Sequence, residues 1–282
     1  MNKKYITTIL SAAAAVTIVA GVALPAFAET SVGVGLSASA TFSASGTRAG
    51  LSAGALLATR ITALTGRADQ EITRRLSALG ALTARVDAMI RLSGTDKSNL
   101  ATSIQSQITA MNTLQAQISA DAAANNTSSL KTDVQSITSS YRIFALILPQ
   151  GMIEAAADRV LTIVGIMNDL ATKFSARIST AQSAGNNVTA ATAALTDFNA
   201  KVSDANTQAQ AAVSEVVSLM PDNGSSTVMA SNTATLKDAR SKILAAQQDF
   251  VTARADAETI IKALATFKVS ANASTTASTT SQ

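Results

Sequence analysis

Apolar residues recur at intervals of three and four through most of this 282-residue chain, which is the period of an α-helix rather than of a β-strand. Alanine, the best helix former and a poor strand former, supplies 58 residues. The three prolines, at positions 25, 149 and 221, lie at the ends of the periodic segments, where a helix tolerates them. The sequence therefore predicts an all-α protein.

The periodic segments predict about six long, antiparallel, coiled-coil-like helices in an elongated bundle, with two three-helix layers as one packing. The predicted helices span about 48–92, 100 to the turn at 125–128, 130 to Pro149, Gly151 to 185, 188–216 and about 232–269. Gly94 is expected in the C-cap position of the first helix. The first three helices would form a region at 48–148 and the last three a region at 149–269. One continuous bundle and two consecutive bundles both fit this pattern.

Residues 1–28 have the pattern of a secretory signal, with two lysines near the start and 19 uncharged residues from 6 to 24. Ala26 and Ala28 form a small-residue cleavage site, so we expect the mature chain to begin at Glu29. An uncleaved membrane anchor is the alternative, because 19 uncharged residues are long enough to span a bilayer.

Low-complexity segments flank the predicted helices. Residues 29–47 are rich in Gly, Ser and Ala and are expected to form a flexible spacer. Residues 270–282 are a tail of mainly Ser, Thr and Ala without charges or aromatic side chains, which we expect to be disordered.

The composition excludes most common catalytic and binding chemistry. The chain has no Cys and no His, which rules out thiol and imidazole catalysis, disulfides and the usual zinc ligands. Removing the two lysines of the signal from 22 basic residues leaves 20 against 18 acidic ones, too balanced for a nucleic-acid partner. Acid–base pairs four residues apart, such as Glu71 with Arg75, are expected on solvated faces. We expect no cofactor, no metal, no small-molecule substrate and no enzymatic activity.

One stretch, residues 141–159, concentrates aromatic and aliphatic side chains around a predicted tight corner at Pro149. It supplies the candidate functional or packing residues Tyr141, Arg142, Phe144, Pro149, Glu154, Asp158 and Arg159. Our interpretation is a well-packed corner, with Arg142 paired to Glu154 or Asp158 near its edge. The alternative is a concealed membrane-active hairpin, as in helical pore-forming toxins.

Several segments between Arg67 and Phe267 have a distinctive amino-acid sequence. RADQEITRRLSALGALTARV is followed by SYRIFALILPQ with AADR at 156–159, and then by LMPDNG and LKDARSKI. In these segments the chain resembles a group of exported, cysteine-free, all-helical proteins of small-genome bacteria whose function is not known. The resemblance implies a cell-envelope or secreted location and an all-helical build, and it carries no functional residue.

Together these features predict an exported, non-enzymatic helical bundle that acts as an envelope scaffold, a spacer or a surface interaction module. Its expected partners are other proteins or further copies of itself, because long coiled-coil-like faces favour association. The alternative function is a membrane-active helical effector that uses the apolar region at 141–167, which makes a membrane surface the alternative partner.

Overall fold

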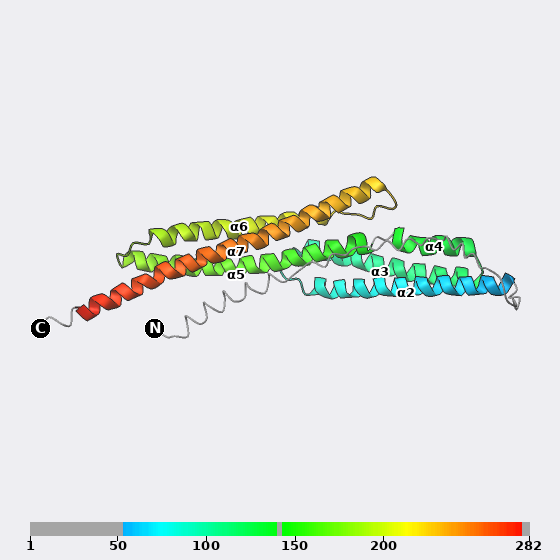
Figure 1. Cartoon of the computed structure of the whole chain (residues 1–282), viewed down its shortest axis with the longest axis horizontal. Coiled ribbons are helices and arrows are strands. Elements are labelled where there is room, and N and C mark those ends of the chain that lie inside the picture. Colours follow the sequence, from blue (N-terminus) through cyan, green and yellow to red (C-terminus); the bar gives the residue numbers. More distant parts are fainter. Residues whose placement is uncertain (1–52, 140–142, 278–282) are drawn as a thin grey trace, which may run out of the picture.

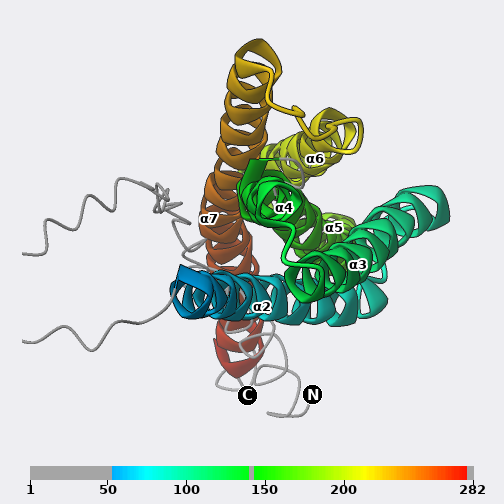
Figure 2. The ribbon, with the colours of Figure 1, turned by 90° about the vertical axis from the view of Figure 1, so that its right-hand side faces the viewer.

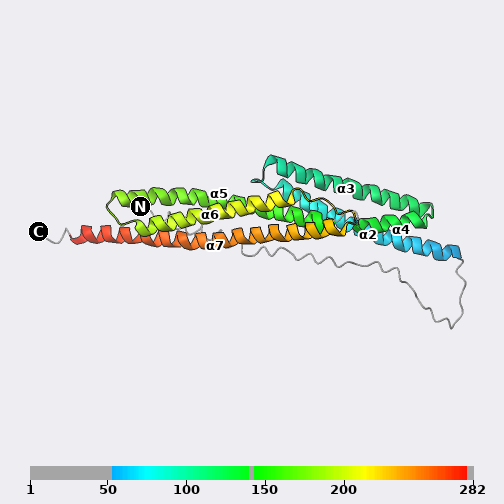
Figure 3. The same ribbon diagram turned by 90° about the horizontal axis from the view of Figure 1, so that it is seen from above.

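The computed structural model describes residues 53–139 and 143–277, with side chains placed for 54–138 and 143–267. The regular elements in these ranges are all helices, so the prediction of an all-α protein is confirmed. Two groups of helices lie end to end along an elongated molecule and overlap near its middle (Figures 1 and 3). The predicted signal at 1–28 and spacer at 29–47 lie outside the described residues.

The N-terminal bundle consists of α2 (Ala53–Asp87), α3 (Gly94–Ala123) and α4 (Thr127–Ser139). Helix α2 ends before the predicted boundary at 92, and the prediction of Gly94 as its C-cap is wrong because Gly94 is the first residue of α3. The Ser93 side chain caps α3 by accepting a hydrogen bond from the Asp96 N–H at 3.0 Å. The turn into α4 uses Asn125 in the left-handed region at φ 55°.

The C-terminal bundle consists of α5 (Leu148–Ser183), α6 (Thr189–Val216) and α7 (Ser226–Ala277). Gly185, at φ 80°, ends α5 in a conformation that glycine adopts without steric cost. The turn before α7 contains Pro221, as predicted, and Asn223 and Gly224 at positive φ. Helix α7 begins at Ser226 rather than at about 232, and it continues to Ala277, past the predicted end at 269.

The predicted tight corner at Pro149 is wrong. A π-helical segment, Ile143–Ile147, leads directly into α5, and Pro149 lies in the first turn of that helix. A proline fits there because the first N–H groups of a helix have no partner within the helix. Helix α4 is described to Ser139 and the π-helical segment begins at Ile143, and Figures 1 and 2 show α4 and α5 nearly in line along the molecule.

The core follows the helix seams. On α5 the buried or partly buried apolar residues alternate in steps of four and three: Ile153, Ala157, Val160, Val164, Met167, Ala171, Phe174 and Ile178. On α7 the buried residues follow the same spacing: Leu236, Ala239, Ile243, Ala246, Phe250, Ala253, Ala257 and Ile260. On α2 this spacing places a charged residue, Arg75, between Ile72 and Leu79, with 4% of its surface exposed. The expectation that Arg75 lies on a solvated face is therefore wrong, and its neighbour Leu76 is only partly buried.

Candidate functional site

The two bundles meet where the N-terminal half of α5 packs against the C-terminal half of α2 and the connection from α2 to α3. We call this region, residues 82–97 and 143–165, the junction. It contains most of the candidate residues at 141–159. Gly151 lets α5 approach α2 closely, because a Cβ at this position would lie 2.6 Å from Cδ1 of Leu82. Leu82 is itself buried, so it has little room to move away.

Asp158 fixes the connection between α2 and α3 to α5. Its Oδ1 accepts hydrogen bonds from the backbone N–H groups of Ile90, Arg91 and Leu92 at 2.9, 2.5 and 3.0 Å. Backbone donors to an ionised carboxylate form charge-assisted bonds, which are stronger than neutral ones. Asp158 thus satisfies three consecutive N–H groups that have left α2 and have not yet entered α3.

Lys97 closes the same connection from the other side. Its Nζ donates to the backbone carbonyls of Asp87 and Met89, both at 2.9 Å, at the C-terminal end of α2. A cation is favourable there because the helix dipole places partial negative charge on the last carbonyls. The Arg91 guanidinium extends toward α5, where its Nη2 lies 3.2 Å from the position a Cβ on Gly165 would occupy.

Glu154 lies on α5 between Gly151 and Asp158. It has no exposed surface, and neither carboxylate oxygen has a hydrogen-bond partner. Burial raises the pKa of Glu154 to about 8, and the negative charge of Asp96 adds to that increase. Glu154 is therefore mainly protonated at neutral pH, unlike an exposed glutamate.

Phe144 packs beside two arginines of α2. The guanidinium of Arg74 lies 4.5 Å from the ring centroid, and that of Arg75 lies 5.1 Å from it. Arg75 also pairs with Glu71, one turn earlier on the same helix. The cation–π contacts hold the π-helical segment against α2. Together with the ion pair, they offset the cost of burying the positive charge of Arg75.

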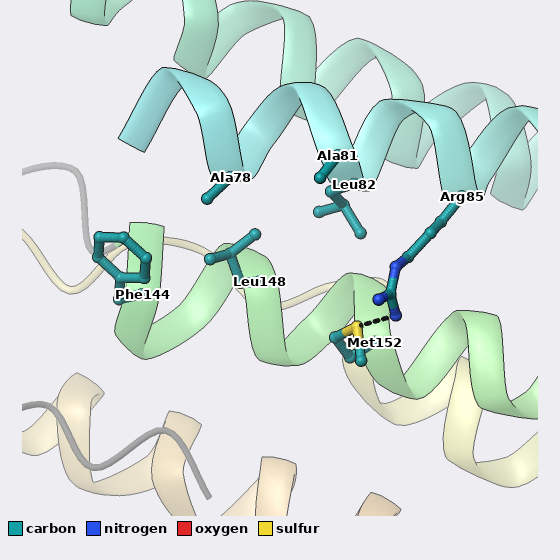
Figure 4. A pocket seen from close by; sticks show the side chains of 7 residues that line it. All are labelled: Ala78, Ala81, Leu82, Arg85, Phe144, Leu148 and Met152. Carbon is teal, nitrogen blue, oxygen red and sulfur yellow. Dashed lines mark hydrogen bonds between the residues drawn. The ribbon is translucent and has the colours of Figure 1, made fainter. Parts of the chain in front are cut away.

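A shallow groove runs between α2 and the start of α5 (Figure 4). Its lining consists of Ala78, Ala81, Leu82, Arg85, Phe144, Leu148 and Met152. At one end Arg85 Nη1 lies 2.8 Å from Sδ of Met152. The groove has a volume of about 170 Å³ and an apolar lining without a carboxylate. Small-molecule sites usually measure about 300–1,000 Å³, so this groove is small for a ligand site.

The structure separates the predicted site residues into three groups. Pro149, Glu154 and Asp158 are buried in the junction, Phe144 is partly buried at its edge, and Arg159 is exposed. Tyr141 and Arg142 lie outside the described residues, as do Ala26, Ala28 and Glu29 of the predicted cleavage site. Because Arg142 lies outside the described residues, its expected pairing with Glu154 or Asp158 stays a prediction. Asp158 binds backbone N–H groups, and Glu154 has no hydrogen-bond partner.

Sequence reasoning missed the contacts that α2 and α3 make at the junction, chiefly those of Leu82 and Asp96. The helical spacing of Gly151, Glu154 and Asp158 on one side of α5 was the available signal, since a glycine beside two carboxyls is unusual for a helix core. Nothing in the local sequence reveals which helix would cross at Gly151.

Two features are absent from the part of the chain that the structure describes. No group of three or more carboxylates there is arranged to hold a metal ion. Within the same ranges, no helix combines the length and the apolar character needed to cross a bilayer. The chain matches no protein-family model, no curated protein and no solved structure.

Proposed function

We propose that this chain is an exported, non-enzymatic helical-bundle protein that acts as a spacer or scaffold through contacts with other proteins. The observation that carries the proposal is the end-to-end arrangement of the two bundles, which makes the molecule long and narrow (Figure 3). With 52 residues at about 1.5 Å each, α7 alone extends about 78 Å. Such a shape holds two attachment points apart.

We further propose that the helices associate as coiled coils. The uninterrupted steps of three and four on α5 and α7 support this, because they repeat every seven residues over several heptads. Large and small residues alternate along α7, as in Leu236, Ala239, Ile243 and Ala246, which favours close contact between neighbouring helices. A strict seven-residue repeat implies a left-handed supercoil.

The outward side of α7 supports a protein-contact role. Leu244 and Val251 are one heptad apart, so they share a face of the helix, and each has 59% of its surface exposed. Exposed apolar side chains in register suit a second helical chain better than they suit water. The proposed partner is therefore another protein, or a second copy of this chain.

The test is to locate the protein in the producing cells and identify its neighbours. We expect an envelope fraction that alkaline carbonate releases, an N-terminus at Glu29, and cross-linked products with a protein partner or a second copy. The double variant Leu244→Glu with Val251→Glu should reduce cross-linking, whereas the exposed control Arg159→Glu should not. A mature chain that stays monomeric and forms no cross-linked product in the envelope or medium contradicts the proposal.

The alternative, a membrane-active effector, depends on release of the apolar region at 141–167. In the structure its large apolar residues, including Ile143, Leu146, Ile147 and Ile153, are buried in the junction. An effector would have to expose them, so leakage of lipid vesicles on addition of the purified mature chain supports this alternative. Absence of leakage over a range of pH and lipid composition contradicts it.

A further inference from the structure

The junction contains one carboxyl group whose charge the surrounding structure does not balance. Glu154 has no exposed surface, and its two oxygens have no hydrogen-bond partner. An ionised carboxylate in this position would lose its hydration without gaining a donor, which costs several kcal/mol. The neutral acid avoids that cost, so a closed junction and a protonated Glu154 favour one another.

The neighbouring charged residues do not stabilise the ionised form of Glu154. The charged residues on the elements around this part of α5 are Arg85 and Asp87 on α2, Arg91 in the connection, Asp96 and Lys97 on α3, Asp158 and Arg159 on α5, Glu215 on α6 and Lys242 on α7. Lys97 binds the carbonyls at the end of α2, and Lys242 binds Glu215 at 2.6 Å. Asp96 acts on Glu154 with a negative charge, which further disfavours its ionised form.

The contacts that close the junction lie on both sides of Glu154. Gly151, Glu154 and Asp158 are three and four residues apart, so they share one side of α5. Gly151 packs on Leu82, and Asp158 holds the N–H groups of residues 90–92. Water can reach the Glu154 carboxyl group only if some of these contacts separate. Hydration of Glu154 is thus coupled to opening between α5 and the end of α2.

We propose that Glu154 is a proton-dependent latch: in its protonated form it lets the junction close, and loss of its proton opens the contact between α5 and the α2–α3 connection. The two bundles then change their angle while the core of α5, α6 and α7 stays intact. The latch depends on the junction's geometry alone and does not rest on the proposed scaffold role. The pKa of Glu154 is raised from 4.5 to about 8 in the closed junction, so closing weakens as the pH rises between these two values.

The chain has no native cysteine, so a pair of spin labels can report the angle between the bundles. Ser106→Cys on α3 and Ser175→Cys on α5 introduce exposed labelling sites, one in each bundle. The distance distribution between the labels is measured by electron–electron double resonance at pH 6 and pH 9, on the chain from Glu29 onward. We expect a narrow distribution at pH 6 and a broader or displaced one at pH 9.

Glu154→Gln in the same labelled background keeps the shape of the side chain and removes its charge. We expect the narrow distribution at both pH values. The matched control is Asp256→Asn on α7, which neutralises another carboxyl group with a raised pKa and should broaden at pH 9 as the parent does. A parent distribution that is the same at pH 6 and pH 9, or a Glu154→Gln variant that broadens as much as the parent, overturns the proposal.

Amide hydrogen exchange on the unlabelled parent provides a second measurement that needs no variant. After correction for intrinsic exchange, protection of the Ile90, Arg91 and Leu92 amides should fall at least tenfold between pH 6 and pH 9, while protection of the α7 core stays unchanged. Constant protection at residues 90–92 overturns the proposal. Equal loss of protection in both bundles also overturns it, because that result indicates global unfolding rather than opening of the junction.

Discussion

The two bundles differ in how regularly their helices are packed. In the C-terminal bundle, α5, α6 and α7 have 36, 28 and 52 residues, and the seams of α5 and α7 keep apolar residues at regular spacing. In the N-terminal bundle, α4 has only 13 residues, and the seam of α2 includes the buried Arg75. Long regular seams give the C-terminal bundle its own core, whereas the N-terminal bundle completes its packing with the π-helical segment and α5. The comparison indicates that the junction is part of the N-terminal bundle's stability.

The largest effect is expected from a cavity in the regular bundle. Phe198 on α6 is fully buried and packs edge-on against Phe174, with 6.0 Å between ring centroids. Phe198→Ala should lower the free energy of unfolding of the C-terminal bundle by about 3–5 kcal/mol. Chemical denaturation with hydrogen exchange of each helix measures the loss and locates it. The control Leu244→Ala, at an exposed position of the same bundle, should change stability by less than about 0.5 kcal/mol.

Removing the Asp158 carboxylate tests whether the junction supports the N-terminal bundle. Asp158→Ala leaves the N–H groups of residues 90–92 without their acceptor, so we expect a loss of about 2–4 kcal/mol. Hydrogen exchange should show the greatest loss of protection in α2 and α3. The neighbouring exposed Arg159→Ala is the control and should have little effect. Equal loss across both bundles would contradict the assignment of the junction to the N-terminal bundle.

Stability should fall as the pH rises from about 4.5 to 8. The pKa of Glu154 is raised to about 8 in the folded state from 4.5, so the folded chain binds more protons than the unfolded chain in this interval. The Glu154 contribution is therefore complete below about pH 4.5 and is lost through pH 8, at a slope of at most about 1.4 kcal/mol per pH unit. Urea unfolding at pH 5, 7 and 9 measures the slope. Glu154→Gln should flatten it and raise stability at pH 9, and an unchanged slope would contradict this account.

The smallest effect is expected at Arg75. Arg75 is buried, but its partner Glu71 has 41% of its side chain exposed, and such a pair often contributes little compared with a well-packed apolar residue. Arg75→Leu should therefore change the free energy of unfolding by about 1 kcal/mol or less, in either direction. A charged residue in a helix seam can fix the register, so in the variant we expect α2 and Phe144 to pack in more than one arrangement. Line broadening of the Phe144 ring resonances measures this. The exposed control Arg67→Leu should leave those resonances sharp.

Sequence reasoning predicted the regular bundle well because its signals are local. The repeats from Ile153 to Ile178 and from Leu236 to Ile260 identify both the helices and their buried faces. The junction was predicted poorly because its geometry depends on contacts between distant segments. Proline commonly ends a helix, yet here the π-helical segment leads into α5 and Pro149 lies in the first turn of that helix.

The candidate carboxyl groups also depend on contacts with distant segments of the chain. The sequence predicted Glu154 and Asp158 as candidate functional or packing residues, but their environments could not be predicted from α5 alone. Asp158 differs from Glu154 because residues 90–92 present their N–H groups to it, and these residues are 66 or more positions away in the sequence. Arg75 was expected to be solvated because its pairing with Glu71 is typical of an exposed face, and only the position of Phe144 shows why it is buried.

The most direct test of the two-bundle account is an engineered disulfide across the junction. In Leu82→Cys with Gly151→Cys, the sulfur at 82 takes the place of Cγ, which lies 3.1 Å from the Cβ position of residue 151. A bond of about 2.05 Å between the two sulfurs fits that geometry. The account predicts rapid intramolecular oxidation at low protein concentration, measured by loss of free thiol and a shift in electrophoretic mobility. If both thiols react freely with a maleimide but form no intramolecular disulfide, α2 and α5 do not meet at Gly151 and the account is wrong.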